Sequence, residues 1–298
     1  MSRPSPLLIN AIPLAFVFLW STGFIGAKYA LPFIEPFYLL LLRMLLTIAV
    51  FVVLCLIFRV EWPSPRQAAH QMVTGALVHA AYLGGVFAAI KWGMPAGIAA
   101  IIVGIQPLLT ALLAWKFQGA HLQARQWLGL LLGLFGVVVI ILSTRGSGAA
   151  GNSFGLPALI ATLIALVGIS VGTLYQKRFG AGVNLLAGSV WQYLSTAVLM
   201  ALLAWSFESR TVIWDRQLIL ALGWLVFGLS VSAILLLMYM IREGEAAKVA
   251  SYFYLVPAVT SIEAWLLFGE SLPWMAIAAI GVTVFGVFLV VMKKPATS

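Results

Sequence analysis

Charged side chains are scarce in this sequence. Only 8% of its 298 residues are Asp, Glu, Lys or Arg, whereas 63% are hydrophobic and the mean hydropathy is +1.10. Soluble domains carry about one quarter charged residues, so this composition excludes a water-soluble globule. Apolar stretches of about 20 residues, each long enough to cross roughly 30 Å of hydrocarbon, recur along the whole chain. The sequence therefore predicts an all-α polytopic membrane protein.

Cysteine and the usual catalytic side chains are scarce as well. The single cysteine, Cys55, excludes an intrachain disulfide and a cysteine-based metal site. The chain has three histidines, two of them at predicted span ends, and no Asp inside any predicted span. Intramembrane enzymes need clustered acids, histidine pairs or an activated serine. A Walker-type phosphate loop is also missing from the sequence. We therefore expect neither an enzyme nor an ATP-driven pump, and neither a cofactor nor a metal.

The few charges are mostly basic, with a net charge of +9 and a pI near 9.9. In a soluble protein this excess would suggest nucleic-acid binding. Here the Lys and Arg residues are scattered one or two per loop, which is the pattern of charges that flank membrane spans. We expect the lipid bilayer, and not nucleic acid, as a partner. The first apolar segment follows Arg3 and reaches Lys28 without a small-x-small cleavage site, so we expect a span and not a signal peptide.

Ten spans can be drawn from apolar length and flanking charge. Pro- and Gly-rich breaks such as Pro63-Ser64-Pro65 and Gly93-Met94-Pro95 separate them. The stretch 145–155 is rich in Gly and Ser, lacks apolar periodicity and lies at the midpoint, so we interpret it as a linker between residues 1–144 and 156–298. The ten predicted spans are 8–28, 36–58, 69–90, 95–115, 126–144, 156–176, 184–205, 217–240, 247–267 and 273–292.

An internal duplication is the most informative pattern in the chain. Residues 97–142 and 247–292 superpose at a constant offset of 150 without a gap. The matches include Pro, Trp, Gly and Thr, which chance similarity between apolar segments does not favour. They are Pro107/Pro257, Thr110/Thr260, Ala114/Ala264, Trp115/Trp265, Gly119/Gly269, Leu122/Leu272, Phe135/Phe285 and Gly136/Gly286. Such a duplication indicates a transporter built from two similar halves around a central site.

Five spans per half have a geometric consequence. After an odd number of crossings the chain is on the other side, so the second half must insert upside down relative to the first. We therefore expect two inverted five-helix repeats and alternating access. Eleven Lys and Arg residues lie on one side and five on the other, which favours both termini in the cytoplasm. The cytoplasmic set is Arg3, Arg59, Arg66, Lys116, Arg125, Lys177, Arg178, Arg242, Lys248, Lys293 and Lys294, and the outer set is Lys28, Lys91, Arg145, Arg210 and Arg216.

The duplicated residues carry a family resemblance. Pro95–Ala100 followed by Gln106–Ala114 resembles the first-copy signature of the drug/metabolite transporter superfamily, EamA type. Pro257–Trp265 followed by Phe268–Leu272 resembles the second copy with its Gly-Glu pair, and Leu19–Phe24 resembles the start of the first span. The first copy departs from this pattern, because it has Gly119-Ala120-His121 and lacks the Glu.

The resemblance covers nearly the whole chain and implies a function. It implies an exporter of small metabolites in the bacterial inner membrane, with amino acids, including apolar and aromatic ones, as first candidates. It also implies a central cavity lined by spans 1, 3, 4, 6, 8 and 9, and we expect a monomer. A multidrug exporter and a nucleoside- or purine-type metabolite exporter remain alternatives, as do a channel and a scramblase. Proton-coupled and facilitated transport both remain open, because Glu263 is the only acid deep inside a predicted span.

Polar side chains within apolar spans are the candidates for a substrate site, because each is costly in hydrocarbon unless it faces protein or water. Arg43 is either a snorkelling residue or a fixed cation that attracts a carboxylate. His79 and Tyr82 share a helix face, as either interhelical hydrogen bonders or substrate contacts. Gln106 precedes Pro107, which we expect to kink its helix, and Pro257 places a matching kink in the second copy.

The first and sixth spans supply hydroxyls, amides and rings at equivalent places. Ser and Thr in such helices also bond to their own backbone or join helices, so both readings stay open. Two tyrosines precede Pro257 and lie on different helix faces, so at most one of them points centrally. The further candidates for substrate binding are Trp20, Ser21, Thr22, Ser170, Tyr175, Gln176, Tyr252 and Tyr254.

Overall fold

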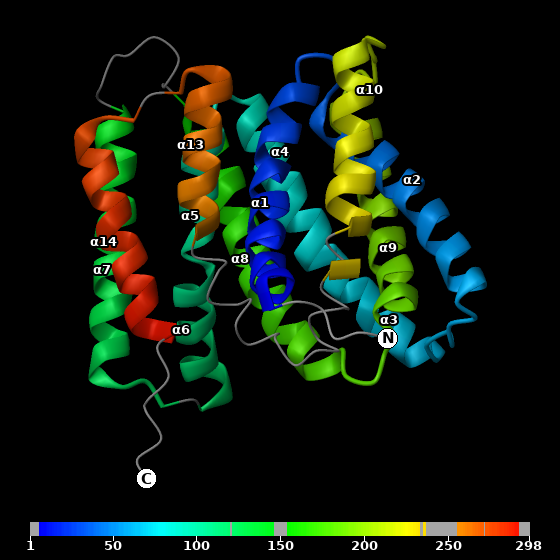
Figure 1. The fold of residues 1–298 in the computed structure, drawn as a ribbon, viewed down its shortest axis with the longest axis horizontal. Helices are drawn as coiled ribbons and strands as arrows, with labels where there is room; N and C mark the ends of the chain where they lie inside the picture. The colour runs from blue at the N-terminus through cyan, green and yellow to red at the C-terminus, as the bar shows by residue number, and fades with distance from the viewer. Residues whose placement is uncertain are drawn as a thin grey trace.

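The computed structural model describes residues 6–119, 121–145, 154–232, 235–236, 255–270 and 272–291. These residues form a bundle of helices (Figure 1). Among them, the only β-type pairing is one isolated bridge between Ile34 and Val212. The helices are α1 (Pro6–Ala30), α2 (Pro36–Ile57), α3 (Pro65–Gly75), η1 (Ala76–Ala81), α4 (Tyr82–Lys91), α5 (Ala96–Gly104), α6 (Gln106–Gln118), α7 (Ala124–Arg145), α8 (Leu156–Phe179), α9 (Leu185–Phe207), α10 (Arg216–Gly223), η2 (Trp224–Val231), α13 (Val256–Phe268) and α14 (Trp274–Val291).

The helices have the length and the surface of membrane spans. Within the described residues, six apolar segments are long enough to cross a bilayer: 36–57, 65–91, 96–117, 124–143, 156–179 and 185–207. Shorter apolar helices cover 216–231, 256–268 and 274–290. Large apolar side chains such as Leu56, Phe117 and Phe207 are exposed on the outside of the bundle, where a soluble protein would carry charges. The prediction of an all-helical polytopic membrane protein is confirmed.

Glycines allow helices to pack closely in this bundle. Helix pairs in lipid gain little from burying apolar surface, so close backbone contact has to hold them together. The helices α7 and α14 lie side by side (Figure 1). A Cβ atom on Gly129 would lie 2.4 Å from the Gly286 carbonyl oxygen, and one on Gly286 would lie 2.6 Å from the Gly129 carbonyl oxygen. Gly281 of α14 is not part of this contact, because a Cβ atom there would meet no atom within 4 Å.

The two halves of the chain share features of backbone geometry that the sequence repeat alone does not show. The helices α6 and α13 have the same length and begin 150 residues apart. Each ends at a left-handed glycine, Gly119 with φ +67° and Gly269 with φ +66°. A π-helix interrupts the predicted third span as η1 and the predicted eighth span as η2. Insertions of this kind are uncommon and gather at functional sites.

The packing of the helices joins segments from both halves. The contacts α2–α9, α7–α14 and α5–α13 each pair one helix from residues 1–144 with one from residues 156–298. The contact of α4 with α8 has a counterpart in the contact of α1 with α10 and η2. Figure 1 shows α7 and α14 at one side of the bundle, α2, α9 and α10 at the other, and α1, α4 and α8 between them.

One end of the bundle is closed by polar contacts between loops, and we call it the clasped end. It comprises residues 31–35, 92–97, 208–215 and 268–270. The Glu208 carboxylate accepts hydrogen bonds from the backbone N–H groups of Phe37 and Tyr38, at 2.7 and 2.8 Å. It thereby caps the start of α2 from another part of the chain. Burial raises the pKa of this carboxyl, and the two backbone donors oppose the shift.

A second carboxylate, Glu270, joins three segments at the clasped end. It pairs with Lys28 at the end of α1. It also accepts hydrogen bonds from the backbone N–H groups of Ala96, at 3.0 Å, and Gly97, at 3.2 Å, in the first turn of α5. An acid is favoured at this place, because the N-terminus of a helix presents unpaired N–H groups and a partial positive charge. The clasp therefore ties α1, α5 and the loop after α13 together.

Candidate functional site

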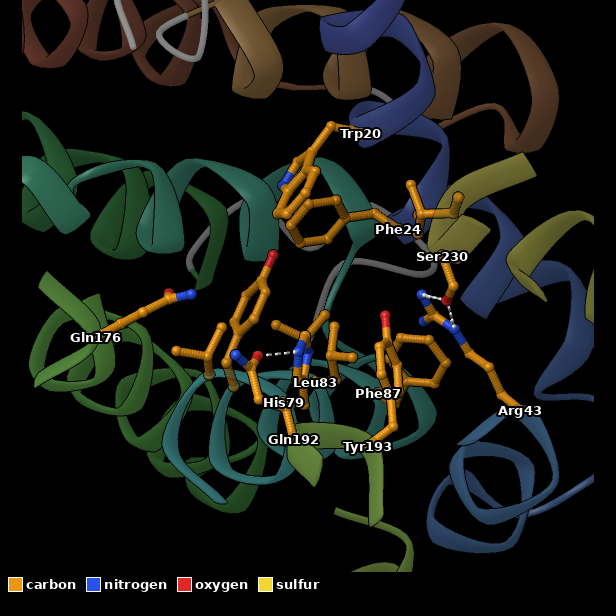
Figure 2. A pocket seen from close by; sticks show the side chains of 15 residues that line it. Trp20, Phe24, Arg43, His79, Leu83, Phe87, Gln176, Gln192, Tyr193 and Ser230 are labelled. Atoms are coloured by element: carbon orange, nitrogen blue, oxygen red, sulfur yellow. Dashed lines mark hydrogen bonds between the residues drawn. The ribbon is translucent and has the colours of Figure 1, made fainter. Parts of the chain in front are cut away.

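A cavity of about 160 Å³ lies in the middle of the bundle. Figure 2 shows the Trp20 and Phe24 rings on one side of it and His79, Leu83 and Phe87 on the other. Arg43 and Gln176 lie at opposite ends of this view. Carbon atoms form most of the wall, and a few polar groups are placed within it, as is usual for small-molecule sites. The described residues that line the cavity are Trp20, Gly23, Phe24, Arg43, Val78, His79, Tyr82, Leu83, Val86, Phe87, Gln176, Gln192, Tyr193, Leu229 and Ser230.

The π-helix η1 presents His79 and the following Tyr82 to the cavity. The neighbouring helices approach it closely because glycines face it. A Cβ atom on Gly168 of α8 would lie 2.7 Å from the Ala81 side chain, and one on Gly75 would lie 2.1 Å from the Gln192 carbonyl oxygen of α9. The segment is therefore held between α8 and α9, with Ala81 against α8 and His79 at the cavity.

His79 belongs to a hydrogen-bonded row of side chains. The Gln192 amide donates from Nε2 to Oε1 of Gln71 at 2.6 Å, and its own Oε1 lies 3.2 Å from Nε2 of His79. Because that oxygen can only accept, the His79 proton belongs on Nε2, and Nδ1 is left as an acceptor. The imidazole also stacks on Tyr193, with ring centroids 4.6 Å apart. His79 is thus both an interhelical hydrogen bonder and a lining residue.

Arg43 is buried and lines the cavity. Its side chain is 3% exposed, and its Nε and Nη2 donate to the Ser230 hydroxyl oxygen at 3.2 and 3.0 Å (Figure 2). The interpretation of Arg43 as a snorkelling residue is therefore wrong, because its head group is held by η2 inside the bundle. Its Nη1 has no hydrogen-bond partner among the residues that the structure describes. A buried guanidinium nitrogen without a partner is unfavourable, so a ligand oxygen would stabilise it.

Several of the predicted site residues do not line this cavity. Their side chains instead bond to a neighbouring helix or to their own backbone, as polar groups in lipid commonly do. The Ser21 hydroxyl bonds to Glu263 at 3.0 Å, and Thr22 accepts from the Trp224 indole at 2.9 Å. The Ser170 hydroxyl donates to the Leu166 carbonyl at 2.7 Å. Tyr175 bonds to His70 at 2.8 Å, and Gln106 donates to Thr173 at 3.0 Å.

The remaining predicted residues divide into two groups. Trp20, Arg43, His79, Tyr82 and Gln176 all line the cavity, and their contact with a substrate stays a prediction. Tyr252 and Tyr254 lie outside the residues that the structure describes.

Pro107 follows an interruption of its helix. The helix α5 ends at Gly104 and α6 begins at Gln106, so the break lies directly before Pro107. Pro257 stands at the corresponding place in α13 and packs against α5, where its Cγ would lie 2.5 Å from a Cβ atom on Gly104. A movement about these prolines stays a prediction.

Spans 2 and 7 contribute to the cavity, although the family resemblance did not place them there. Arg43 comes from α2, and Gln192 and Tyr193 come from α9. None of the described residues that line the cavity comes from α5, α6 or α13. For the described residues, the expectation that spans 4 and 9 line the cavity is therefore wrong. The helices α5 and α13 pack against each other instead, with Ser261 Oγ 3.1 Å from a Cβ atom placed on Gly97. A signal for Gln192 existed, because it is an amide within an apolar span.

Comparison with known proteins matches the chain to one family. The model of the EamA-like transporter family matches residues 8–142 and again residues 156–292. The chain is 31% identical to an uncharacterized inner membrane transporter, YedA, of Escherichia coli K12. The matched 232 residues cover 78% of this chain and 74% of the relative. It is 25% identical to a probable amino-acid metabolite efflux pump of Salmonella typhimurium, with 93% of both chains covered. A solved crystal structure with 23% identity has a TM-score of 0.65 over 96% of both chains, so the fold is shared.

Proposed function

Because the chain belongs to the EamA-like transporter family, we propose that it is an alternating-access exporter in a bacterial inner membrane that carries amino acids with apolar or aromatic side chains. The observation that carries the proposal is the central cavity, which is lined by aromatic rings, an imidazole, amides and one guanidinium. A zwitterion with an apolar side chain suits such a lining. A multivalent cation would need several carboxylates, and none is found among the described lining residues.

The size of the cavity supports a small substrate. Its volume of about 160 Å³ is close to that of an engineered apolar cavity of about 150 Å³ that binds one benzene ring. Sites for drug-sized ligands measure roughly 300–1,000 Å³. A single-ring or branched aliphatic amino acid therefore fits this cavity better than a multidrug substrate does. The name of the Salmonella relative, a probable amino-acid metabolite efflux pump, supports the same substrate class.

We further propose ten transmembrane helices in two inverted five-helix repeats, residues 1–144 and 156–298, joined by the linker 145–155. Three observations support this arrangement: the two family matches, the equal bounds of α6 and α13 at an offset of 150, and a π-helix in the third and eighth spans. Exchange of the conformations of two such halves opens the cavity to one side and then to the other.

Both termini are cytoplasmic in this proposal. Reporter fusions after Ser298 and within the linker, for example at Gly148, should report opposite sides of the membrane. The expectation rests on the excess of Lys and Arg on one side. A fusion at Asn184, in the loop between α8 and α9, is a matched control and should report the side of Ser298. Equal signals from Ser298 and Gly148 would contradict the ten-helix model.

Transport by the purified protein tests the function. Proteoliposomes should take up labelled phenylalanine or leucine in a saturable manner, and nucleosides and cationic dyes more slowly. His79→Ala should lower the rate for the preferred substrate about tenfold or more, because it removes a lining side chain and leaves the Gln192 amide oxygen unpaired. Tyr82→Ala should act in the same direction, and the double variant should show less than the summed loss.

The control variant for this experiment is His70→Ala. Its ring stacks on Phe179 and bonds to Tyr175, outside the described lining of the cavity. Monodispersity by size exclusion has to be equal for all variants. A wild-type rate for folded His79→Ala at every substrate concentration would mean that this histidine only joins helices. Conduction that does not saturate would favour a channel over a carrier.

A further inference from the structure

Arg43 is the only permanently charged side chain among the described residues that line the central cavity. Arg43 places a guanidinium, which is always protonated, against the cavity. No Asp or Glu is found among the lining residues that the structure describes. Glu263, an acid within a span, bonds to Ser21 and does not belong to this lining. The cavity thus carries a fixed positive charge beside apolar walls, which attracts anions and repels cations.

One nitrogen of the Arg43 guanidinium has no hydrogen-bond partner among the described residues. Two of its nitrogens, Nε and Nη2, share the Ser230 hydroxyl, and this hydroxyl in turn donates to the Leu225 carbonyl within the same helix at 3.1 Å. The third nitrogen, Nη1, is buried and has no partner in the described part of the chain. A carboxylate oxygen is the partner that a guanidinium binds best, through short charge-assisted hydrogen bonds. A hydroxyl or a carbonyl would leave the charge without compensation.

A carboxylate that would pair with a substrate ammonium is missing from the described lining. Amides, phenol hydroxyls and the His79 Nδ1 are neutral, and they compensate a buried ammonium poorly compared with a carboxylate. An amine placed in this cavity would also experience repulsion from Arg43. The carboxylate of an amino acid therefore contributes attraction here, and its ammonium contributes little.

We propose that the cavity recognises the carboxylate of its substrate at Arg43 and does not require an ammonium group. The transported class is then small monocarboxylates with an apolar or single-ring body, of which apolar amino acids are one member and their deaminated analogues another. The body of the substrate lies between the Trp20 and Phe24 rings and the row of His79, Leu83 and Phe87, and extends toward Gln176 (Figure 2). This inference rests on the proposed function of the chain as a carrier of small metabolites.

Three related compounds separate the two ends of an amino acid. Phenylalanine carries both charges, 3-phenylpropionate carries only the carboxylate, and phenylalanine amide carries only the ammonium. Wild-type proteoliposomes at neutral pH should take up the first two compounds in a saturable and mutually competitive manner, and the amide at least tenfold more slowly. Liposomes without protein correct for passive entry of the uncharged forms.

Variants of Arg43 connect this selectivity to the residue. Arg43→Gln should raise the apparent Kd for both carboxylates on the order of 100-fold, which is the usual effect of removing one partner of a buried charge pair. Arg43→Lys should restore part of the affinity, because it keeps the charge and loses the fork of donors. Ser230→Ala, which keeps the guanidinium, should have a smaller effect than Arg43→Gln. Uptake of the amide should fall in none of these variants, and Arg43→Gln should raise it, because the repulsion between the guanidinium and the ammonium is removed.

The outcomes of this experiment distinguish the inference from the proposed function. The carboxylate site is overturned if the amide is taken up at the rate of phenylalanine, or if Arg43→Gln leaves the affinity for carboxylates unchanged. In either case the proposed function as a carrier still stands. Failure of 3-phenylpropionate to bind or compete, while phenylalanine is transported, shows that the ammonium is required and overturns the carboxylate site too. If the wild type transports no compound of any class, the proposed function itself fails. If Arg43→Gln does not fold, the relative uptake of the three compounds by the wild-type protein still tests the inference.

Discussion

Gly75→Ala should prevent the normal packing of the bundle, whereas Gly223→Ala should be tolerated. Both glycines immediately precede a π-helix, η1 and η2, and both have ordinary helical dihedral angles, so alanine strains neither backbone. A Cβ atom on Gly75 would lie 2.1 Å from the Gln192 carbonyl oxygen and 2.6 Å from the Gln192 Cα. These are backbone atoms of α9, which cannot rotate away, so the helix itself has to move. A Cβ atom on Gly223 meets nothing within 4 Å.

The measurement is thermal unfolding in detergent, combined with the yield of monodisperse protein. Overpacking of a tight contact costs typically about 1–3 kcal/mol, and a clash with backbone belongs at the upper end of that range or above it. Gly223→Ala should be neutral or slightly stabilising, because alanine favours a helix by up to about 1 kcal/mol over glycine. Similar melting temperatures for the two variants would mean that α3 and α9 are farther apart than the structure has them.

A surviving population of Gly75→Ala should also have lost transport. The helix that moves carries Gln192 and Tyr193, and these two side chains hold the His79 ring through a hydrogen bond and a stacking contact. A shift of α9 by one ångström therefore displaces the imidazole from the cavity. Stability and transport are coupled here, because the same residues pack the helices and line the site.

Much of this fold was predictable, because membrane spans follow from a simple requirement. Every backbone polar group in hydrocarbon has to be satisfied within its own segment, so about 20 apolar residues between charged loops indicate a helix. The duplication could be recognised from matched residues of uncommon types, such as Pro107 and Pro257. Their constant offset of 150 residues defines the two halves of the chain. The π-helices could not be predicted, because no residue type specifies them and they arise from how neighbouring helices pack.

The candidate site was only partly predictable, for a related reason. A polar residue in an apolar span indicates a partner, but the sequence does not say whether that partner is a substrate or another helix. His79 and Gln176 line the cavity, whereas Ser170 and Gln106 bond within the bundle. Tyr193 could not be found at all, because its role follows from the position of α9 against η1. Arg43 was identified as a candidate, and only its burial distinguishes it from a snorkelling residue.

Glu270→Gln should open the clasped end of the bundle. The Glu270 side chain is 9% exposed, and its carboxylate holds Lys28 and two backbone N–H groups of α5. Hydrogen bonds to a charged group are worth about 1.5–3 kcal/mol each, whereas glutamine keeps one oxygen and no charge. A loss of about 3 kcal/mol changes the ratio of closed to open molecules roughly 100-fold. The residue 150 positions earlier is Ala120, so the sequence has no equivalent acid for the other end.

The accessibility of a single cysteine reports this opening. In a Cys55→Ser background, Phe24→Cys should react slowly with an impermeant maleimide added on the clasped side. Phe24 is 4% exposed and lies along α1 between Trp20 and Lys28 at the clasped end. Addition of Glu270→Gln should increase the labelling rate by more than tenfold. Lys28→Met should increase it less, because the bonds of Glu270 to Ala96 and Gly97 remain. Glu61→Gln, an exposed acid at the opposite end, is the matched control and should leave the rate unchanged. Equal labelling rates with and without Glu270→Gln would contradict this prediction. They would show that apolar packing, and not the Glu270 carboxylate, keeps the clasped end closed.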